Sequence, residues 1–203
     1  MNTHLPLLVL SHHGGVPEPF ARFVRDGRLA AEWEWDITQA RIAAARGVML
    51  TLHLDQIRAM EWRDGFDAML AQGGRVLLNG HAERPFLPGV GHFILGGKQR
   101  KHLTLSVLGD HPLFEGVDRL TFETRRGVAG FYGRGHNAMP AGAQALTGIG
   151  PDAAPLDWVW RRDGGGGVLS HAGNDLWTGS EDMALIDRLL DNAVRWLAHE
   201  TEA

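Results

Sequence analysis

Polar side chains collect at the ends of four apolar segments of this 203-residue sequence, and each set contains histidine. The sets are Ser11, His12 and His13; His53 and Asp55; Asn79, His81, Glu83 and Arg84; and Ser170, His171, Asn174 and Asp175. A histidine beside a carboxylate can act as an oriented general base. Three His or Asp side chains can hold Zn²⁺ or another divalent ion. Neutral His, Asn and Arg can hydrogen-bond an anionic or polyhydroxy ligand, so the residue types leave three chemistries open.

Spacing and composition restrict metal binding and thiol chemistry. The sequence contains neither an H-x-H nor an H-E-x-x-H pattern, so a metal site would need side chains from separate strands. It contains no cysteine, which excludes thiolate catalysis and Cys-based zinc sites within this chain. We therefore assign no cofactor and retain a divalent metal such as zinc as an alternative.

The apolar segments of the first half predict a parallel sheet. The predicted strands are Leu5–Leu10, residues 30–37, residues 48–56 and residues 75–81, with helical segments between them. This β-α-β-α-β-α-β order implies right-handed crossovers with helices on both faces. Parallel strands end at one edge of the sheet, so their polar ends would meet in one cleft. We expect that cleft to be lined by His12, His53, Asp55, His81 and His171.

The second half predicts further strands and a long final helix. The strands are expected in "LTLSVL", "LTFET", "AQALTGI" and "LDWVWRR", and "GVLSHAGND" is expected to be a last strand and the loop after it. The turn "DGGGG" lacks the lysine and the following helix of a phosphate loop, so we interpret it as structural. Thr178 and Glu181 have the spacing of a capping box and predict the start of the final helix. The buried stripe of that helix would be Ile186, Leu189, Leu190, Ala193 and Leu197.

Charge and hydropathy argue against nucleic-acid and membrane partners. The formal net charge is −4, so the chain has no basic footprint for nucleic acid. Its seven Trp and eight Phe do not alternate with Lys or Arg as a base-stacking surface would. The apolar run near the N-terminus is too short for a signal segment or a bilayer span. We expect a cytoplasmic protein with a small-molecule ligand.

Three motifs in the second half are shared with a known superfamily: "GDHPLFEGV", "GGVLSHAGNDLW" and "LLDNAVRWLAH". In this order they resemble the class I glutamine amidotransferase-like superfamily, and most closely its trehalose-utilisation (ThuA-like) branch. The N-terminal "VLSHHGG" and the later "GGRVLLNGH" fit the same flavodoxin-like sheet. The resemblance covers nearly the whole chain. It implies one domain over residues 1–203, an α/β flavodoxin-like three-layer sandwich with a mostly parallel sheet and antiparallel additions in the second half.

The resemblance also implies roles for the polar strand ends. Glutamine-hydrolysing members carry a cysteine in the turn after the fourth main strand, with a histidine and an acid late in the chain. The matching turn here holds Gly80 and His81, while His171 and Asp175 take the late positions. Without cysteine, glutamine hydrolysis by a thiolate is excluded. The implied acid–base groups are therefore His81, His171 and Asp175. The residues expected to bind substrate are His12, His53, Asp55, Asn79, Arg84 and Asn174.

Three functions stay open at this point. The first is an enzyme, a hydrolase or isomerase, acting on a small polar compound that is carbohydrate-like or carboxylated. The second is a non-catalytic ligand-binding or partner domain on a degenerate amidotransferase scaffold. The third is a structural subunit whose aromatic surfaces, including Trp158 and Trp160, contact another chain. The resemblance makes a homo-oligomer reasonable. For loop residues of a cleft, replacing His81 or His171 by Ala should leave folding nearly intact and weaken binding or turnover.

Overall fold

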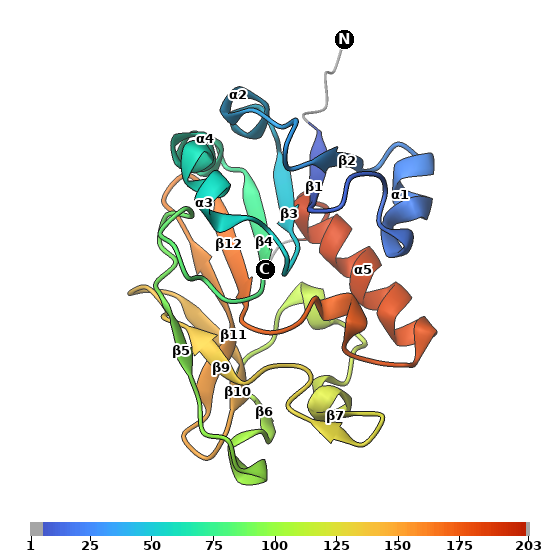
Figure 1. Cartoon of the computed structure of the whole chain (residues 1–203), viewed down its shortest axis with the longest axis vertical. Coiled ribbons are helices and arrows are strands. Elements are labelled where there is room, and N and C mark those ends of the chain that lie inside the picture. The colour runs from blue at the N-terminus through green and yellow to red at the C-terminus, as the bar shows by residue number, and fades with distance from the viewer. Residues whose placement is uncertain (1–5, 202–203) are drawn as a thin grey trace.

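A single eight-stranded sheet, in the order β2-β1-β3-β4-β12-β11-β10-β6, runs through the molecule (Figure 1). The computed structural model describes residues 6–201, so Leu5 of the predicted first strand lies outside the described residues. The parallel strands are β1 (Leu7–Ser11), β2 (Ala30–Trp33), β3 (Gly47–Leu50), β4 (Arg75–Asn79) and β12 (Gly167–His171). The antiparallel strands are β11 (Ala154–Arg161), β10 (Gln144–Ile149) and β6 (Leu105–Val107). This sheet confirms the predicted α/β class with antiparallel additions in the second half.

Helices cover both faces of the sheet. On one face lie α1 (Ala21–Arg25) and α5 (Met183–Leu197), and on the other lie α2 (Gln39–Ala43), α3 (Gln56–Ala59) and α4 (Arg63–Ala71). Along β1, Leu7 and Val9 belong to the first core cluster, whereas Leu8 and Leu10 belong to the second. Both faces of the inner strands are therefore buried, which explains their uninterrupted apolar runs.

The final helix has the predicted stripe but begins later than predicted. Its predicted stripe residues are all buried: Ile186, Leu189, Leu190, Ala193 and Leu197. The capping box of Thr178 and Glu181 is wrong, because Asp182 is the N-cap and its side chain accepts hydrogen bonds from the N–H groups of Ala184 and Leu185. The Thr178 hydroxyl instead donates to the Asp175 carbonyl over 2.7 Å.

The segment "LTFET" was expected to be a strand and instead forms a 3-10 helix, η5 (Arg119–Glu123). The Asp118 side chain accepts from the Leu120 N–H at its start, and the buried Arg119 guanidinium donates to the Leu146 carbonyl. These polar contacts oppose an extended segment. The remaining short helices are η1 (Glu18–Phe20), η2 (Met60–Trp62), η3 (Arg100–His102), η4 (Pro112–Phe114) and η6 (Leu176–Thr178). Two small antiparallel pairs complete the fold: β5 (Phe93–Leu95) with β9 (Gly135–Asn137), and β7 (Thr124–Arg125) with β8 (Val128–Ala129).

The strand order places a topological switch point between β1 and β3. From β1 the chain adds β2 on one side, then crosses to add β3 and β4 on the other. In open α/β sheets, ligands bind outside the carboxyl ends of the strands where the order reverses. The strand order alone therefore indicates that a ligand would bind beside the carboxyl ends of β1 and β3. Among the described residues, no helix is both long and apolar enough to cross a membrane.

Candidate functional site

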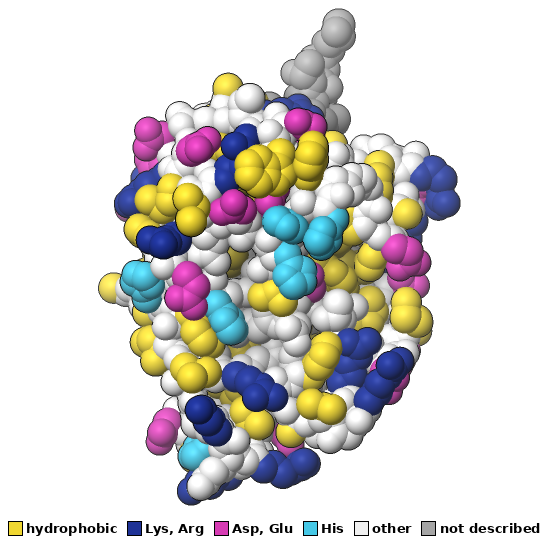
Figure 2. Space-filling view, in the orientation of Figure 1, with side chains coloured by type: hydrophobic (Ala, Val, Ile, Leu, Met, Phe, Trp, Pro, Cys, Tyr) yellow, Lys and Arg dark blue, Asp and Glu magenta, His cyan; other side chains and the backbone are white. Residues whose placement is uncertain are grey.

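A pocket of about 200 Å³ opens at this switch point. Its walls come from the segment after β1, the segment after β3 and the loop after β12. The lining residues are Ser11, His12, His13, Gly14, Val16, Pro17, Thr51, His53, Asp175 and Trp177. Figure 2 shows histidine side chains gathered on this face of the molecule. The structure therefore brings His12, His53 and Asp175 together and adds His13, Ser11 and Thr51 to them.

His12 is paired with a carboxylate that the sequence did not identify. Its Nδ1 lies 2.5 Å from Oε1 of Glu34. The Glu34 side chain is fully buried, whereas 38% of the His12 side chain is exposed. The second oxygen of Glu34 accepts a hydrogen bond from the Asp55 N–H over 3.1 Å. Because a carboxylate only accepts, His12 donates through Nδ1, which leaves Nε2 as the nitrogen that can exchange a proton.

Glu34 is buried because β2 ends before it. The strand stops at Trp33, and the Glu34 N–H then donates to the Ser11 carbonyl. This turn carries Glu34 under the pocket while Trp33 and Trp35 stay exposed. In the sequence, the one signal was a glutamate between two tryptophans within the strand predicted over residues 30–37.

His13 and His53 form the outer wall of the pocket. The ring centres of His12 and His13 are 4.9 Å apart, and those of His13 and His53 are 6.2 Å apart. Both outer rings belong to exposed residues. Asp55, expected to bind substrate, caps α3, with Oδ1 accepting from the N–H groups of Ile57 and Arg58. Asp55 therefore contacts the site through its backbone N–H, which donates to Glu34, while its side chain serves as the helix cap.

Asp175 brings a partly buried carboxyl to the pocket. Its Oδ1 accepts a hydrogen bond from the Leu52 N–H over 2.8 Å. Burial raises the pKa of this carboxyl, against the lowering effects of the Leu52 N–H and of the nearby His53 and His171. A carboxyl with a raised pKa close to histidines is a usual component of functional sites.

Asp175→Asn is expected to increase the free energy of unfolding at pH 7. Because the folded-state pKa lies above the ordinary value of 3.8, the stabilising contribution of Asp175 is present below that value and is lost as the pH rises through the folded pKa. At pH 7 the buried ionised carboxylate therefore costs stability, and the amide removes that cost while still accepting from Leu52. Urea unfolding at pH 7 and pH 3 measures this, with the exposed Asp152→Asn as control. A variant less stable than the wild type at pH 7 would contradict the expectation.

His171 lies beneath the pocket and is completely buried. Its Nδ1 is 2.6 Å from Asp157 Oδ1, and its Nε2 is 2.7 Å from the Asn174 carbonyl oxygen. The Asn174 carbonyl only accepts, so Nε2 donates to it, while Nδ1 is hydrogen-bonded to the Asp157 carboxyl group. The Tyr132 hydroxyl donates to the other oxygen of Asp157 over 2.9 Å. Burial is the main cause that raises the pKa of Tyr132, followed by Asp157. In this arrangement His171 holds the loop that carries Asp175.

The two asparagines assigned to substrate binding form hydrogen bonds within the protein. The buried Asn79 donates from Nδ2 to the Leu50 carbonyl and accepts at Oδ1 from the Leu176 N–H. Asn174 donates from Nδ2 to the Phe131 carbonyl. These bonds connect the ends of β3, β4 and β12, so both side chains help to set the shape of the edge.

His81 lies on a different part of this edge, stacked on Phe93 with ring centres 3.6 Å apart. Burial lowers its pKa, and Glu83 opposes the shift. The Gln56 side chain holds the same loop, because its Nε2 donates to the His81 carbonyl and its Oε1 accepts from the N–H groups of Glu83 and Arg84. Arg84 is exposed. The pocket at the switch point is lined by neither His81 nor Arg84.

The turn after β4 has room for no side chain at Gly80. Gly80 has φ +102°, and a Cβ built on it would lie 2.8 Å from Cδ1 and 3.2 Å from Cα of Leu52. The loop leads to β5 without the helix that follows a nucleophile turn. Across the described part of the chain, no group of three or more His, Cys, Asp and Glu side chains is placed to hold a metal ion.

The fold is that of an α/β protein of the flavodoxin-like kind, with its pocket at the switch point. No protein-family model matches the sequence, and no curated protein sequence is similar to it. Among solved structures, the chain is similar to a proposed subunit of GMP synthase from Thermoplasma acidophilum, with a TM-score of 0.59 and 10% identity. The similarity covers 98% of this chain and 96% of that one. This likeness concerns the fold, and the resemblance to the class I glutamine amidotransferase-like superfamily and to its ThuA-like branch stays a prediction.

Proposed function

We propose that this protein binds a small polar molecule with hydroxyl or carboxyl groups in the switch-point pocket, and that His12 is its acid–base group. This proposal rests on the contact of 2.5 Å between His12 Nδ1 and Oε1 of the fully buried Glu34. A buried carboxylate fixes the tautomer and direction of an imidazole, which is what a general base requires. His13, His53, Thr51 and Asp175 would contact the ligand.

The size and lining of the pocket support a small ligand. Its volume of about 200 Å³ lies below the roughly 300–1,000 Å³ of pockets for drug-sized molecules. Ser11 and Thr51 line it together with His12, His13, His53 and Asp175. Such donors and acceptors suit a carbohydrate-like or carboxylated compound, and they suit hydrolysis or isomerisation because both reactions need proton transfer.

We further propose that the scaffold is amidotransferase-like, in the ThuA-like branch, without the chemistry of glutamine hydrolysis. The motifs "GDHPLFEGV" and "GGVLSHAGNDLW" and the fold likeness support the scaffold. The missing cysteine and the blocked Cβ position at Gly80 separate this chain from thiolate catalysis. We therefore assign the acid–base role to His12 in place of His81 and His171.

Neither the wild-type protein nor a Gly80→Cys variant is expected to release ammonia from glutamine above background. A cysteine at this position would adopt a strained left-handed backbone and collide with Leu52, at a cost of about 1–3 kcal/mol. An ammonia assay together with urea unfolding measures both effects. Sustained ammonia release by either protein would contradict the proposed loss of this chemistry.

A non-catalytic ligand-binding domain is the alternative, and the buried His171 favours it. Both ring nitrogens of the histidine that the family resemblance made catalytic are occupied by protein partners. The pocket would then bind its ligand without turning it over.

Calorimetric titration with D-gluconate, which has both hydroxyl and carboxyl groups, tests the proposal. Saturable binding that is lost in His12→Ala supports it. Binding that is equal in wild type and His12→Ala contradicts the assignment of His12.

A further inference from the structure

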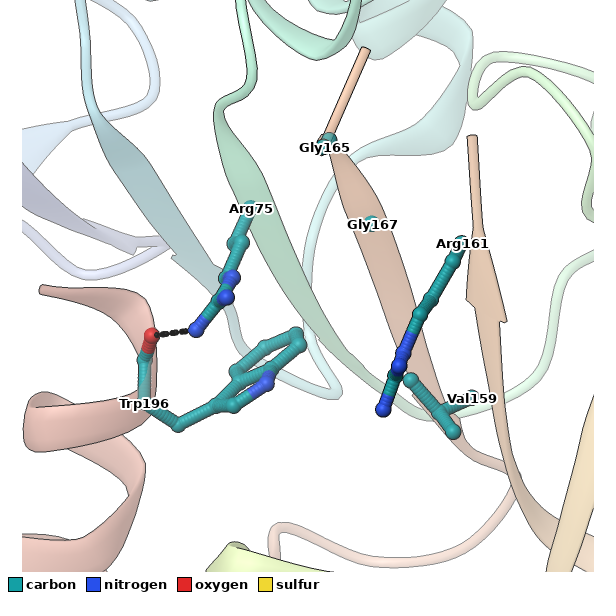
Figure 3. Close-up of a pocket in the computed structure, with 7 residues that line it drawn as sticks. Arg75, Val159, Arg161, Gly165, Gly167 and Trp196 are labelled. Atoms are coloured by element: carbon teal, nitrogen blue, oxygen red, sulfur yellow. Dashed lines mark hydrogen bonds between the residues drawn. The ribbon is translucent and has the colours of Figure 1, made fainter. Parts of the chain in front are cut away.

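A second pocket, of about 270 Å³, lies at the opposite, amino edge of the parallel strands (Figure 3). The register of three neighbouring strands determines which residues line it. Gly167 of β12 pairs with Arg75 of β4 on one side and with Arg161 of β11 on the other. Register partners in a sheet point to the same face, and neighbouring strands are about 4.8 Å apart. Two arginines therefore stand about 10 Å apart on one face, with a residue that has no side chain between them.

The notch between these arginines is positively charged. Figure 3 shows Arg75 and Arg161 on either side of Trp196, which with Val159 forms the apolar floor. Arg75 is held in place because its Nη1 donates to the carbonyls of Trp196, in the last turn of α5, and of Thr201, which follows that helix. Arg161 makes no hydrogen bond or ion pair with the described residues, so its guanidinium can turn to a ligand. The lining contains no carboxylate.

The positive charge extends beyond the notch. A neighbouring pocket shares Arg75 and Gly165 with it, adds Arg46 and His199, and is also lined by no carboxylate. Burial, followed by Arg75 and Arg46, lowers the pKa of His199 to about 4. Burial, followed by Arg161, Arg75 and Arg119, lowers the pKa of His111 to about 4 on the other side of Trp196. Both histidines are thus neutral at pH 7, and the arginines supply the charge.

We propose that this notch binds the phosphate group of a small molecule. A phosphate group carries about −1.5 to −2 charges at pH 7, which matches two guanidinium groups. One guanidinium group can donate two parallel, charge-assisted hydrogen bonds to the oxygens of a phosphate group. Gly165 and Gly166 of the "DGGGG" turn form part of the rim. Gly165 has φ +92°, and nothing lies within 4 Å of a Cβ built on it, so the rim is open to a ligand at this position.

Titration with inorganic phosphate tests this site. Arg161→Gln is expected to weaken phosphate binding by roughly tenfold or more, because a charge-assisted hydrogen bond is lost. Arg100→Gln, which removes the same charge from η3, should bind phosphate like the wild type. Acetate, with a single charge, should bind more weakly than phosphate.

Three outcomes would overturn the proposal. Equal weakening in Arg161→Gln and Arg100→Gln would show an effect of net charge. Equal affinity for acetate and phosphate would contradict the phosphate assignment. Phosphate binding that is lost in His53→Ala and kept in Arg161→Gln would place the anion at the switch-point pocket. D-gluconate binding at that pocket should be unchanged by Arg161→Gln, so the two proposals can fail separately.

Discussion

Replacement of His171 by Ala is expected to lower the free energy of unfolding by about 3–5 kcal/mol, because it leaves the fully buried Asp157 carboxyl group without the ring that contacts it over 2.6 Å. This reverses the expectation from sequence, in which His171 was a loop residue whose removal would spare the fold. Both members of the pair are fully buried and lie on neighbouring strands in register. Removing one partner of such a pair is costly, even where the pair itself adds little net stability.

Urea unfolding measures the effect of His171→Ala. The control is His92→Ala, which removes an exposed imidazole and should change the free energy of unfolding by about 0.5 kcal/mol or less. A double variant that also carries Asp157→Ala should cost less than the sum of the single changes, since no charge is then left unpaired. A loss below about 1 kcal/mol in His171→Ala would contradict the stabilising role of this buried pair.

Glu34→Gln is expected to weaken D-gluconate binding by roughly tenfold while the fold is retained. The amide oxygen can still accept from His12 Nδ1, but the charge that strengthens this bond is lost and the NH2 group cannot accept from the Asp55 N–H. Calorimetric titration measures this change. Glu32→Gln is the matched control, because Glu32 lies two residues earlier, on β2, and pairs with Arg41 outside the pocket. Equal affinities in the two variants would remove Glu34 from the site.

The sheet could be predicted because its inner strands are apolar on both faces. The segments around Leu8, Val48 and Leu77 are continuous buried runs, and they became the adjacent strands β1, β3 and β4. Because these strands are parallel, it could also be predicted that their polar ends would lie along one edge of the sheet. Failures occurred where a local polar contact decided the structure, as at Asp118 before η5 and Asp182 before α5.

The pairing within the site could not be predicted in the same way. Glu34 lies in the middle of the strand predicted over residues 30–37, and it contacts His12 only because β2 ends early, at Trp33. His171 pairs with Asp157, which lies on the antiparallel strand β11. The register of that strand cannot be inferred from hydropathy alone. Which histidines face the pocket depends on such long-range contacts.

The NMR spectrum of protein with ¹³C-labelled histidine rings, recorded during titration with D-gluconate, tests the central claim most directly. We expect the ring signals of His12, His13 and His53 to shift together along one saturation curve, while those of His92 and His102 stay in place. Signals of His12, His13 and His53 that remain unchanged up to the highest concentration of D-gluconate would contradict the proposed site.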